Sequence, residues 1–177
     1  KLNFFPDAVF EGIITKVERR SPDRFTYSGT LTDDPSGFFT LTRERDAWVA
    51  SAHSARGDYE VTPAPGGASP ESGGVLVVKQ FDTNQFPLRH AEPKRLDQAV
   101  KVEAAPVNQS LTQVVPVIDL MVVYTSQARA AAGGPNSINA IIQMYIAETN
   151  AALAASPINA TVRLAHAAEF NYPETGN

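Results

Sequence analysis

Residues 117–124 read VIDLMVVY, a nearly continuous apolar run that only Asp119 interrupts. A run of this kind is typical of a β-strand that is buried on both of its faces. The sequence therefore predicts a core strand at this point, and the segments on its two sides differ in kind.

A helix and a second strand are expected after the apolar run. Residues 133–137 break the chain with two glycines and a proline, and they offer Asn136 or Ser137 as a helix cap. Residues 156–157, Ser-Pro, end the helix, and residues 160–165 then alternate in the manner of a strand. One stripe of the predicted helix is apolar and consists of Ile138, Ile141, Ile142, Tyr145, Ile146 and Leu153. The order strand, helix, strand predicts a parallel strand pair in a mixed sheet.

The first half of the chain shows a different pattern, that of short antiparallel strands. Phe25, Tyr27, Gly29 and Leu31 lie two apart, as residues on one face of a strand do. Residues 33–37 read DDPSG, which is a strong turn signal. Strands spaced about ten residues apart predict a small antiparallel β-sandwich or barrel. The other expected strands are residues 8–17, 38–42, 47–52, 59–62 and 75–81.

Charge is divided unevenly along the chain, which indicates a domain boundary. Residues 1–95 carry 12 basic and 13 acidic side chains, whereas the remaining residues carry 3 and 6. Prolines and small polar residues fill a stretch without a stable period between the two parts. We therefore expect an α+β chain with a β-rich part at residues 1–92, a linker at residues 93–115 and a β-α-β unit at residues 116–177.

Composition argues against several classes of protein. The 177 residues carry a formal net charge of −4, so a nucleic-acid partner is not expected. No apolar stretch is long enough to cross a bilayer, so no membrane association is expected either. The absence of cysteine excludes disulfides and a thiolate zinc site. No signal segment opens the chain, which leaves a cytoplasmic protein or a secreted one whose signal has been removed.

Three segments resemble the reprolysin-like zinc metallopeptidases, a family of the metzincin class. They are the strand block at residues 118–125, the helix that carries residues 147–150 and the strand at residues 162–166, in the order that the family has them. The likeness is strongest to bacterial secreted members, a group that includes the peptidyl-Asp metalloendopeptidases. Phe5-Pro6-Asp7, which leads into a strand, is similar to the start of their β-rich propeptides.

This resemblance implies the N-terminal part of a secreted zymogen. Residues 1–92 would be a propeptide that inhibits the enzyme and assists its folding, and residues 93–115 would be the processing linker. Residues 116–177 would be the β-α-β start of the metzincin mixed sheet, with the remainder of the catalytic domain as their partner. The complete enzyme would use zinc to hydrolyse peptide bonds in protein substrates.

The catalytic motif of that family is not in this chain. Metzincins bind zinc through H-E-x-x-H-x-x-G-x-x-H on one helix, and the Glu acts as the general base. The three histidines, His53, His90 and His166, lie in three separate segments, and none of them begins this motif. No catalytic residue is therefore assigned here, and this chain alone is expected to bind no zinc and to be inactive.

Two residues are candidates for an inhibitory zinc ligand in the propeptide. Metzincin propeptides commonly use a cysteine, which this chain lacks, whereas astacin-type propeptides use an Asp. Asp82 follows the last expected strand at a comparable place, and His90 lies in a proline-flanked loop. Carboxylate and imidazole both bind zinc. The competing interpretation of Asp82 is a solvated turn after a strand.

Other residues carry weaker indications. Lys94-Arg95 is a dibasic pair in the linker and is the candidate processing site. By resemblance, Asp119 is a candidate calcium ligand, although a single hydrogen-bonded carboxylate fits the pattern equally well. His53 and the inner-strand His166 are interpreted as structural.

A second class of function stays open at this point. Residues 56–58 spell Arg-Gly-Asp, the integrin-binding tripeptide, although Gly-Asp also suits the tip of a hairpin. The alternative to a zymogen is therefore a non-catalytic β-sandwich module that serves adhesion or protease inhibition. A longer reading frame distinguishes the two, because the protease needs H-E-x-x-H downstream.

Overall fold

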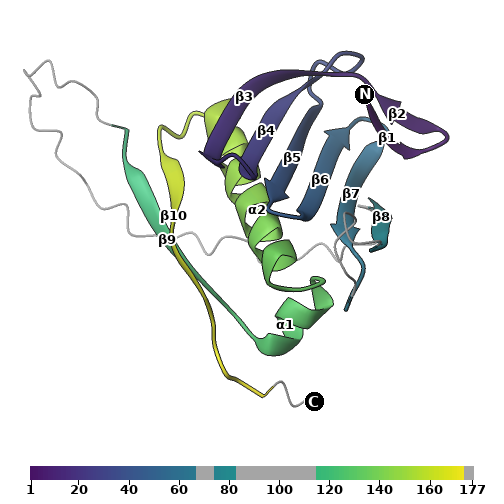
Figure 1. The fold of residues 1–177 in the computed structure, drawn as a ribbon. Helices are drawn as coiled ribbons and strands as arrows, with labels where there is room; N and C mark the ends of the chain where they lie inside the picture. The colour runs from purple at the N-terminus through teal and green to yellow at the C-terminus, as the bar shows by residue number, and fades with distance from the viewer. Residues whose placement is uncertain (67–73, 83–114, 174–177) are drawn as a thin grey trace, which may run out of the picture.

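The computed structural model describes residues 1–66, 74–82 and 115–173. These residues form an antiparallel sheet with a long helix across one face, a small hairpin against the other face and a parallel strand pair beside the helix (Figure 1). The α+β class expected from the sequence is confirmed. The linker at residues 93–115 lies almost wholly outside the described residues.

The large sheet is a meander in which each strand pairs with its neighbours in sequence. Its six strands are β3 (Gly12–Ser21), β4 (Arg24–Leu31), β5 (Phe38–Glu44), β6 (Ala47–Ser54), β7 (Gly57–Pro63) and β8 (Leu76–Phe81). Gly57 has a φ of 131°, a backbone conformation that glycine adopts more readily than other residues. This conformation allows the tight turn from β6 into β7. The sandwich- or barrel-like closure is not confirmed, because a helix covers one face where a second large sheet was expected.

A hairpin of β1 (Leu2–Phe5) and β2 (Ala8–Phe10) packs on the opposite face of this sheet. Phe4 and Phe10 each lie 5.4 Å from the Tyr59 ring, measured between ring centroids. The single strand expected at residues 8–17 is therefore wrong. It divides at Glu11 because Phe10 enters this core while Gly12 begins the pairing with β4.

Two helices follow the apolar run, α1 (Ser126–Ala131) and α2 (Pro135–Ala155). The expected cap at Asn136 or Ser137 is wrong, because Gly134 caps α2 and Pro135 occupies its first turn. Proline suits this position because the first helical N–H groups have no partner within the helix. The end of the helix at Ser156 is as expected. Among the described helices, none is long and apolar enough to span a membrane.

The apolar run forms β9 (Val117–Tyr124), which pairs in parallel with β10 (Thr161–Glu169), as the β-α-β order predicted. Its expected burial on both faces is wrong for the described part of the chain. Met121 is 69% exposed and Val123 is 57% exposed, because β10 is the only described strand beside β9. His166 on β10 is likewise exposed, so its interpretation as an inner histidine is also wrong.

Candidate functional site

Strand alternation places both apolar and polar side chains of β6 beneath α2. Val49 packs with Ala140 and Met144 of the helix in a small buried core. Two and four residues further along β6, Ser51 and His53 lie on the same face and meet polar residues instead. The helix is therefore held to the sheet by an apolar contact at one level and by polar groups at the next.

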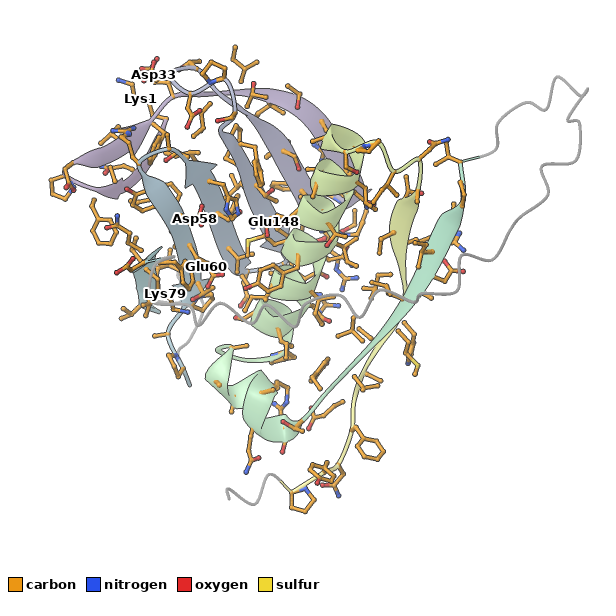
Figure 2. The ribbon with its side chains drawn as sticks, turned by 180° about the vertical axis from the view of Figure 1, so that it is seen from behind. Lys1, Asp33, Asp58, Glu60, Lys79 and Glu148 are labelled. Atoms are coloured by element: carbon orange, nitrogen blue, oxygen red, sulfur yellow. The ribbon has the colours of Figure 1, made fainter. Side chains whose placement is uncertain are left out.

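These polar groups line a small pocket with a volume of about 200 Å³. Figure 2 shows Asp58, Glu60 and Glu148 in this region between the sheet and the helix. We call the group the polar cluster, and it consists of Ser51, His53, Asp58, Glu60, Tyr145 and Glu148.

His53 lies between two carboxylates of the polar cluster. Its Nδ1 is 3.0 Å from Oδ1 of Asp58, and its Nε2 is 3.8 Å from Oε1 of Glu148. The Ser51 hydroxyl donates to that same Glu148 oxygen. The Phe38 ring stacks on the imidazole at a centroid distance of 4.5 Å. Glu148 and then Asp58 raise the pKa of His53, against the opposing effect of partial burial.

Glu60 forms the other half of the polar cluster and is only 7% exposed. The Tyr145 hydroxyl donates to Oε2 of Glu60 at 2.9 Å, and Lys79 Nζ lies 3.3 Å from Oε1. Partial burial, reinforced by the hydrogen bond to Glu60, raises the pKa of Tyr145, whose side chain is about half exposed. These contacts join α2 to β7 and β8.

The arrangement holds the helix in place and does not form a nucleophilic site. Ser51 is buried, and its hydroxyl proton is committed to Glu148, so His53 does not activate it as a nucleophile. Within residues 1–66, 74–82 and 115–173, no group of three or more His, Asp or Glu residues is arranged to hold a metal ion. The polar cluster does contain three carboxylates and one histidine, so its net charge depends on whether His53 is protonated.

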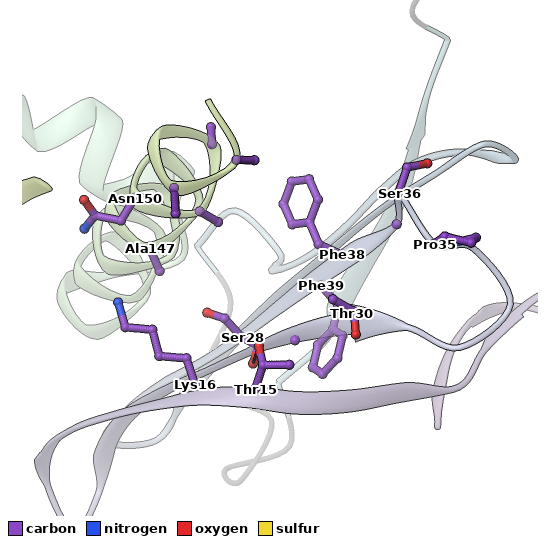
Figure 3. Close-up of a pocket in the computed structure, with 16 residues that line it drawn as sticks. Thr15, Lys16, Ser28, Thr30, Pro35, Ser36, Phe38, Phe39, Ala147 and Asn150 are labelled. Atoms are coloured by element: carbon purple, nitrogen blue, oxygen red, sulfur yellow. Dashed lines mark hydrogen bonds between the residues drawn. The ribbon is translucent and has the colours of Figure 1, made fainter. Parts of the chain in front are cut away.

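A second hollow lies between the C-terminal half of α2 and strands β3 and β4 (Figure 3). This groove has a volume of about 520 Å³, and Ala147 and Asn150 line its helix side while Thr15 and Lys16 line its sheet side. Lys16 is the only charged residue of its described lining. The groove is suited to apolar contact and offers no acid or base pair for chemistry.

The site residues expected from the sequence are not brought together. Asp119 lies on the exposed β9, where its two oxygens accept hydrogen bonds of 2.8 and 2.9 Å from Arg163, and this pairing lowers the pKa of Asp119. Asp82 directly follows β8 and is exposed. His90 and the Lys94-Arg95 pair lie outside the described residues. The calcium, inhibitory and processing roles of these residues stay predictions.

The Arg-Gly-Asp tripeptide lies at the turn between β6 and β7, with Arg56 in the turn and Gly57 and Asp58 at the start of β7, in keeping with the turn interpretation. The Arg56 guanidinium lies 4.1 Å from the centroid of the Phe10 ring and donates to the Val9 carbonyl at 3.0 Å. Asp58 is occupied by His53. Both charged ends of the tripeptide are thus engaged within the chain, which disfavours the adhesion alternative.

Sequence reasoning missed Glu148 and Glu60, and it assigned Tyr145 only to an apolar stripe. The available signal was the spacing of Tyr145 and Glu148, which lie three apart and therefore on one face of a helix. A Glu beside a buried stripe needs a partner, but the sequence does not say which strand supplies it.

Comparison with known proteins gives two relatives along the whole chain. They are peptidyl-Asp metalloendopeptidases of Stenotrophomonas maltophilia, from strains K279a and R551-3, and are 28% and 27% identical over 184 aligned residues. The alignment covers all of this chain and 40% of each relative, so the chain spans well under half the length of the curated relatives it matches. No family model and no solved structure matches it. The chain is therefore a distant homologue of these metallopeptidases.

Proposed function

We propose that this chain is the N-terminal part of a secreted zinc metalloendopeptidase zymogen. The observation that carries the proposal is the similarity of the entire chain to 40% of two metalloendopeptidases, in a sequence without H-E-x-x-H. Residues 1–92 are then the propeptide, residues 93–115 the processing linker and residues 116–177 the start of a metzincin catalytic domain.

The contact between sheet and helix supports an inhibitory and folding-assisting role for the propeptide. In this division of the chain, α2 belongs to the catalytic part, yet it packs against β5 and β6 of residues 1–92. A propeptide that holds the first long helix gives the catalytic domain a surface on which to fold. It also keeps that helix in a propeptide-bound arrangement until processing occurs.

The exposed apolar side chains of β9 support a further partner, the remainder of the catalytic domain. Ile118, Met121 and Val123 are each close to half exposed or more. Apolar strand residues left in water favour association, and an open strand edge favours pairing. We propose that chain outside these residues covers β9 in the complete protein.

The residues that the structure describes do not fit a zinc site of their own. His53 is engaged by Asp58, and Asp119 is engaged by Arg163 through both oxygens. Because this sequence also lacks H-E-x-x-H, we assign the catalytic zinc ligands and the general base to parts of the complete enzyme that it does not contain. Protein substrates would be bound there as well.

The proposal is tested by comparing this 177-residue chain with a precursor made from the longer reading frame. We expect the chain alone to hold no stoichiometric zinc and to cleave no protein substrate. The processed precursor should hold one tightly bound zinc and lose its peptidase activity on chelation. Tightly bound zinc in the 177-residue chain, or a processed precursor whose activity survives chelation, would contradict the proposal.

Latency gives a further prediction on the precursor. If Asp82 supplies a zinc ligand, Asp82→Ala should speed activation several-fold, and mild acid should do the same to the native precursor because protonation removes the ligand. His90→Ala should do less, because a carboxylate is ionised throughout the neutral range. The rate of appearance of peptidase activity in purified precursor is the measurement.

Asp33→Ala is the matched control, since this exposed carboxylate lies in a turn of the same sheet. It should leave the activation rate unchanged. Equal latency in the Asp82 and His90 variants and the native precursor would show that the propeptide blocks the enzyme by bulk alone.

A further inference from the structure

The position of His53 between two carboxylates makes its protonated form the one that the structure accommodates. A neutral imidazole donates from one nitrogen only, so a ring that donates to Asp58 from Nδ1 presents a bare lone pair at Nε2. That nitrogen is buried, has no hydrogen-bond partner among the described residues, and lies 3.8 Å from Oε1 of Glu148. An imidazolium places an N–H on both sides and faces both carboxylates with positive charge.

The surrounding charges make the loss of that proton costly. Strand β7 contributes Asp58 and Glu60, β8 contributes Lys79, and α2 contributes Tyr145 and Glu148. Three carboxylates therefore face two cations, His53 and Lys79, and Lys79 pairs with Glu60. Once His53 is neutral, the partner that the structure gives Glu148 is the Ser51 hydroxyl. The Glu148 side chain is only 15% exposed, so water replaces the lost cation poorly.

Besides the polar cluster, a small apolar core and one further polar contact hold α2 on the sheet. The buried apolar core beneath α2 consists of Ala47, Val49, Ala140 and Met144, with Ile141 packed against it, and Ile138 and Ile142 of the helix are also buried. A further polar contact joins Asn136 Nδ2 to Asp46 Oδ1 at 2.6 Å near the start of the helix. A change in the polar cluster therefore bears directly on whether α2 stays on the sheet.

We propose that the polar cluster is a pH-sensitive latch, in which protonated His53 holds α2 on the sheet of residues 1–92 and deprotonation of His53 releases it. The inference concerns this chain itself and does not depend on the identity of the complete enzyme. If the zymogen proposal also holds, the latch would loosen the propeptide as the pH rises.

The direction of the pH dependence follows from the position of the proton. The docked helix raises the pKa of His53, so docking is fully favoured below the ordinary histidine value and weakens as the pH rises through the value in the docked chain. The ratio of released to docked chain therefore rises between low and high pH. It rises about tenfold for each unit by which the pKa of His53 in the docked chain exceeds its pKa in the released chain.

The chain suits a direct measurement of docking. Trp48 on β6 is its single tryptophan, and the absence of native cysteine allows one acceptor dye at Thr149→Cys on the exposed side of α2. Energy transfer from Trp48 to the dye should fall as the pH is raised from about 5.5 to about 8.5, the range in which histidine titrates. In His53→Gln the transfer should be independent of pH across that range.

His166→Gln is the matched control, because His166 is exposed on β10 and has no place in the polar cluster. It should keep the native response. Titration of His53 by NMR gives an independent test in a chain that keeps the histidine, since Glu148→Gln should move the pKa of His53 toward its ordinary value. A pH response that persists in His53→Gln would overturn the latch. A flat response in the native chain, or a His53 titration that Glu148→Gln leaves unchanged, would overturn it as well.

Discussion

Met144→Ala is expected to lower the free energy of unfolding of this chain by about 2–5 kcal/mol, the usual result of truncating a fully buried side chain in a core. Met144 is 0% exposed and packs with Val49 and Ala140 between α2 and the sheet. Small neighbours cannot expand to fill the space that its removal leaves. Urea unfolding at constant m-value measures the loss as a lower midpoint.

Met121→Ala makes the same chemical change at an exposed position and is therefore the control. Met121 is 69% exposed on β9, and its truncation should change the stability of the 177-residue chain by no more than about 0.5 kcal/mol. Equal losses in the two variants would contradict the placement of α2. In the longer precursor, we expect Met121→Ala to become destabilising, because the remainder of the catalytic domain is proposed to cover β9.

The strands of the meander could be predicted because their signals are local. The alternation through Phe25 and Leu31 and the turn at residues 33–37 both act over a few residues, and the structure places β4 and β5 around that turn. Whether the sheet closes into a sandwich or a barrel is not a local property, because it depends on what covers each face of the sheet. The sequence periodicity was compatible with a second sheet, and the structure places α2 there.

The burial of β9 could not be predicted from its composition, because an apolar strand is buried only where other chain covers it. Residues 117–124 have the pattern of a strand with two covered faces, yet the described residues supply only β10 beside it. An apolar strand with exposed faces is what we expect where further chain covers it in the complete protein. This agrees with the proposal that β9 belongs to a larger domain.

The polar cluster was unpredictable for a further reason, which is sequence distance. Ser51 and Glu148 are 97 residues apart, and Tyr145 and Glu60 are 85 residues apart. Each residue alone is an ordinary polar side chain on a strand or a helix. The crossing of α2 over β6 brings Glu148 to His53, whereas Asp58 reaches His53 as its cross-strand neighbour in the β6–β7 hairpin.

Gly29→Ala is expected to lower the free energy of unfolding by about 3 kcal/mol, at the upper end of the usual effect of overpacking. A Cβ atom at Gly29 would lie 2.0 Å from the backbone oxygen of Ile13 and 2.7 Å from Cε1 of Phe39. The first contact is with the backbone of the paired strand β3, which a rotamer change cannot relieve. Strand β3 must therefore move away from β4, and its amides should exchange with solvent faster.

Gly37→Ala separates this steric effect from the general consequence of replacing glycine. A Cβ there would lie 2.8 Å from Cδ1 of Leu31, the end of a flexible side chain, and 3.0 Å from Cβ of Asp34, which lies in the same turn and not in a paired strand. Its loss should be no more than about 1 kcal/mol, the ordinary size of a single-residue effect. Because β3 is the edge strand beside the groove under α2, its loss in Gly29→Ala should leave exchange in β6 and β7 near native. Equal destabilisation by both variants, or uniform loss of protection across the sheet, would show that β3 and β4 do not approach as closely as described.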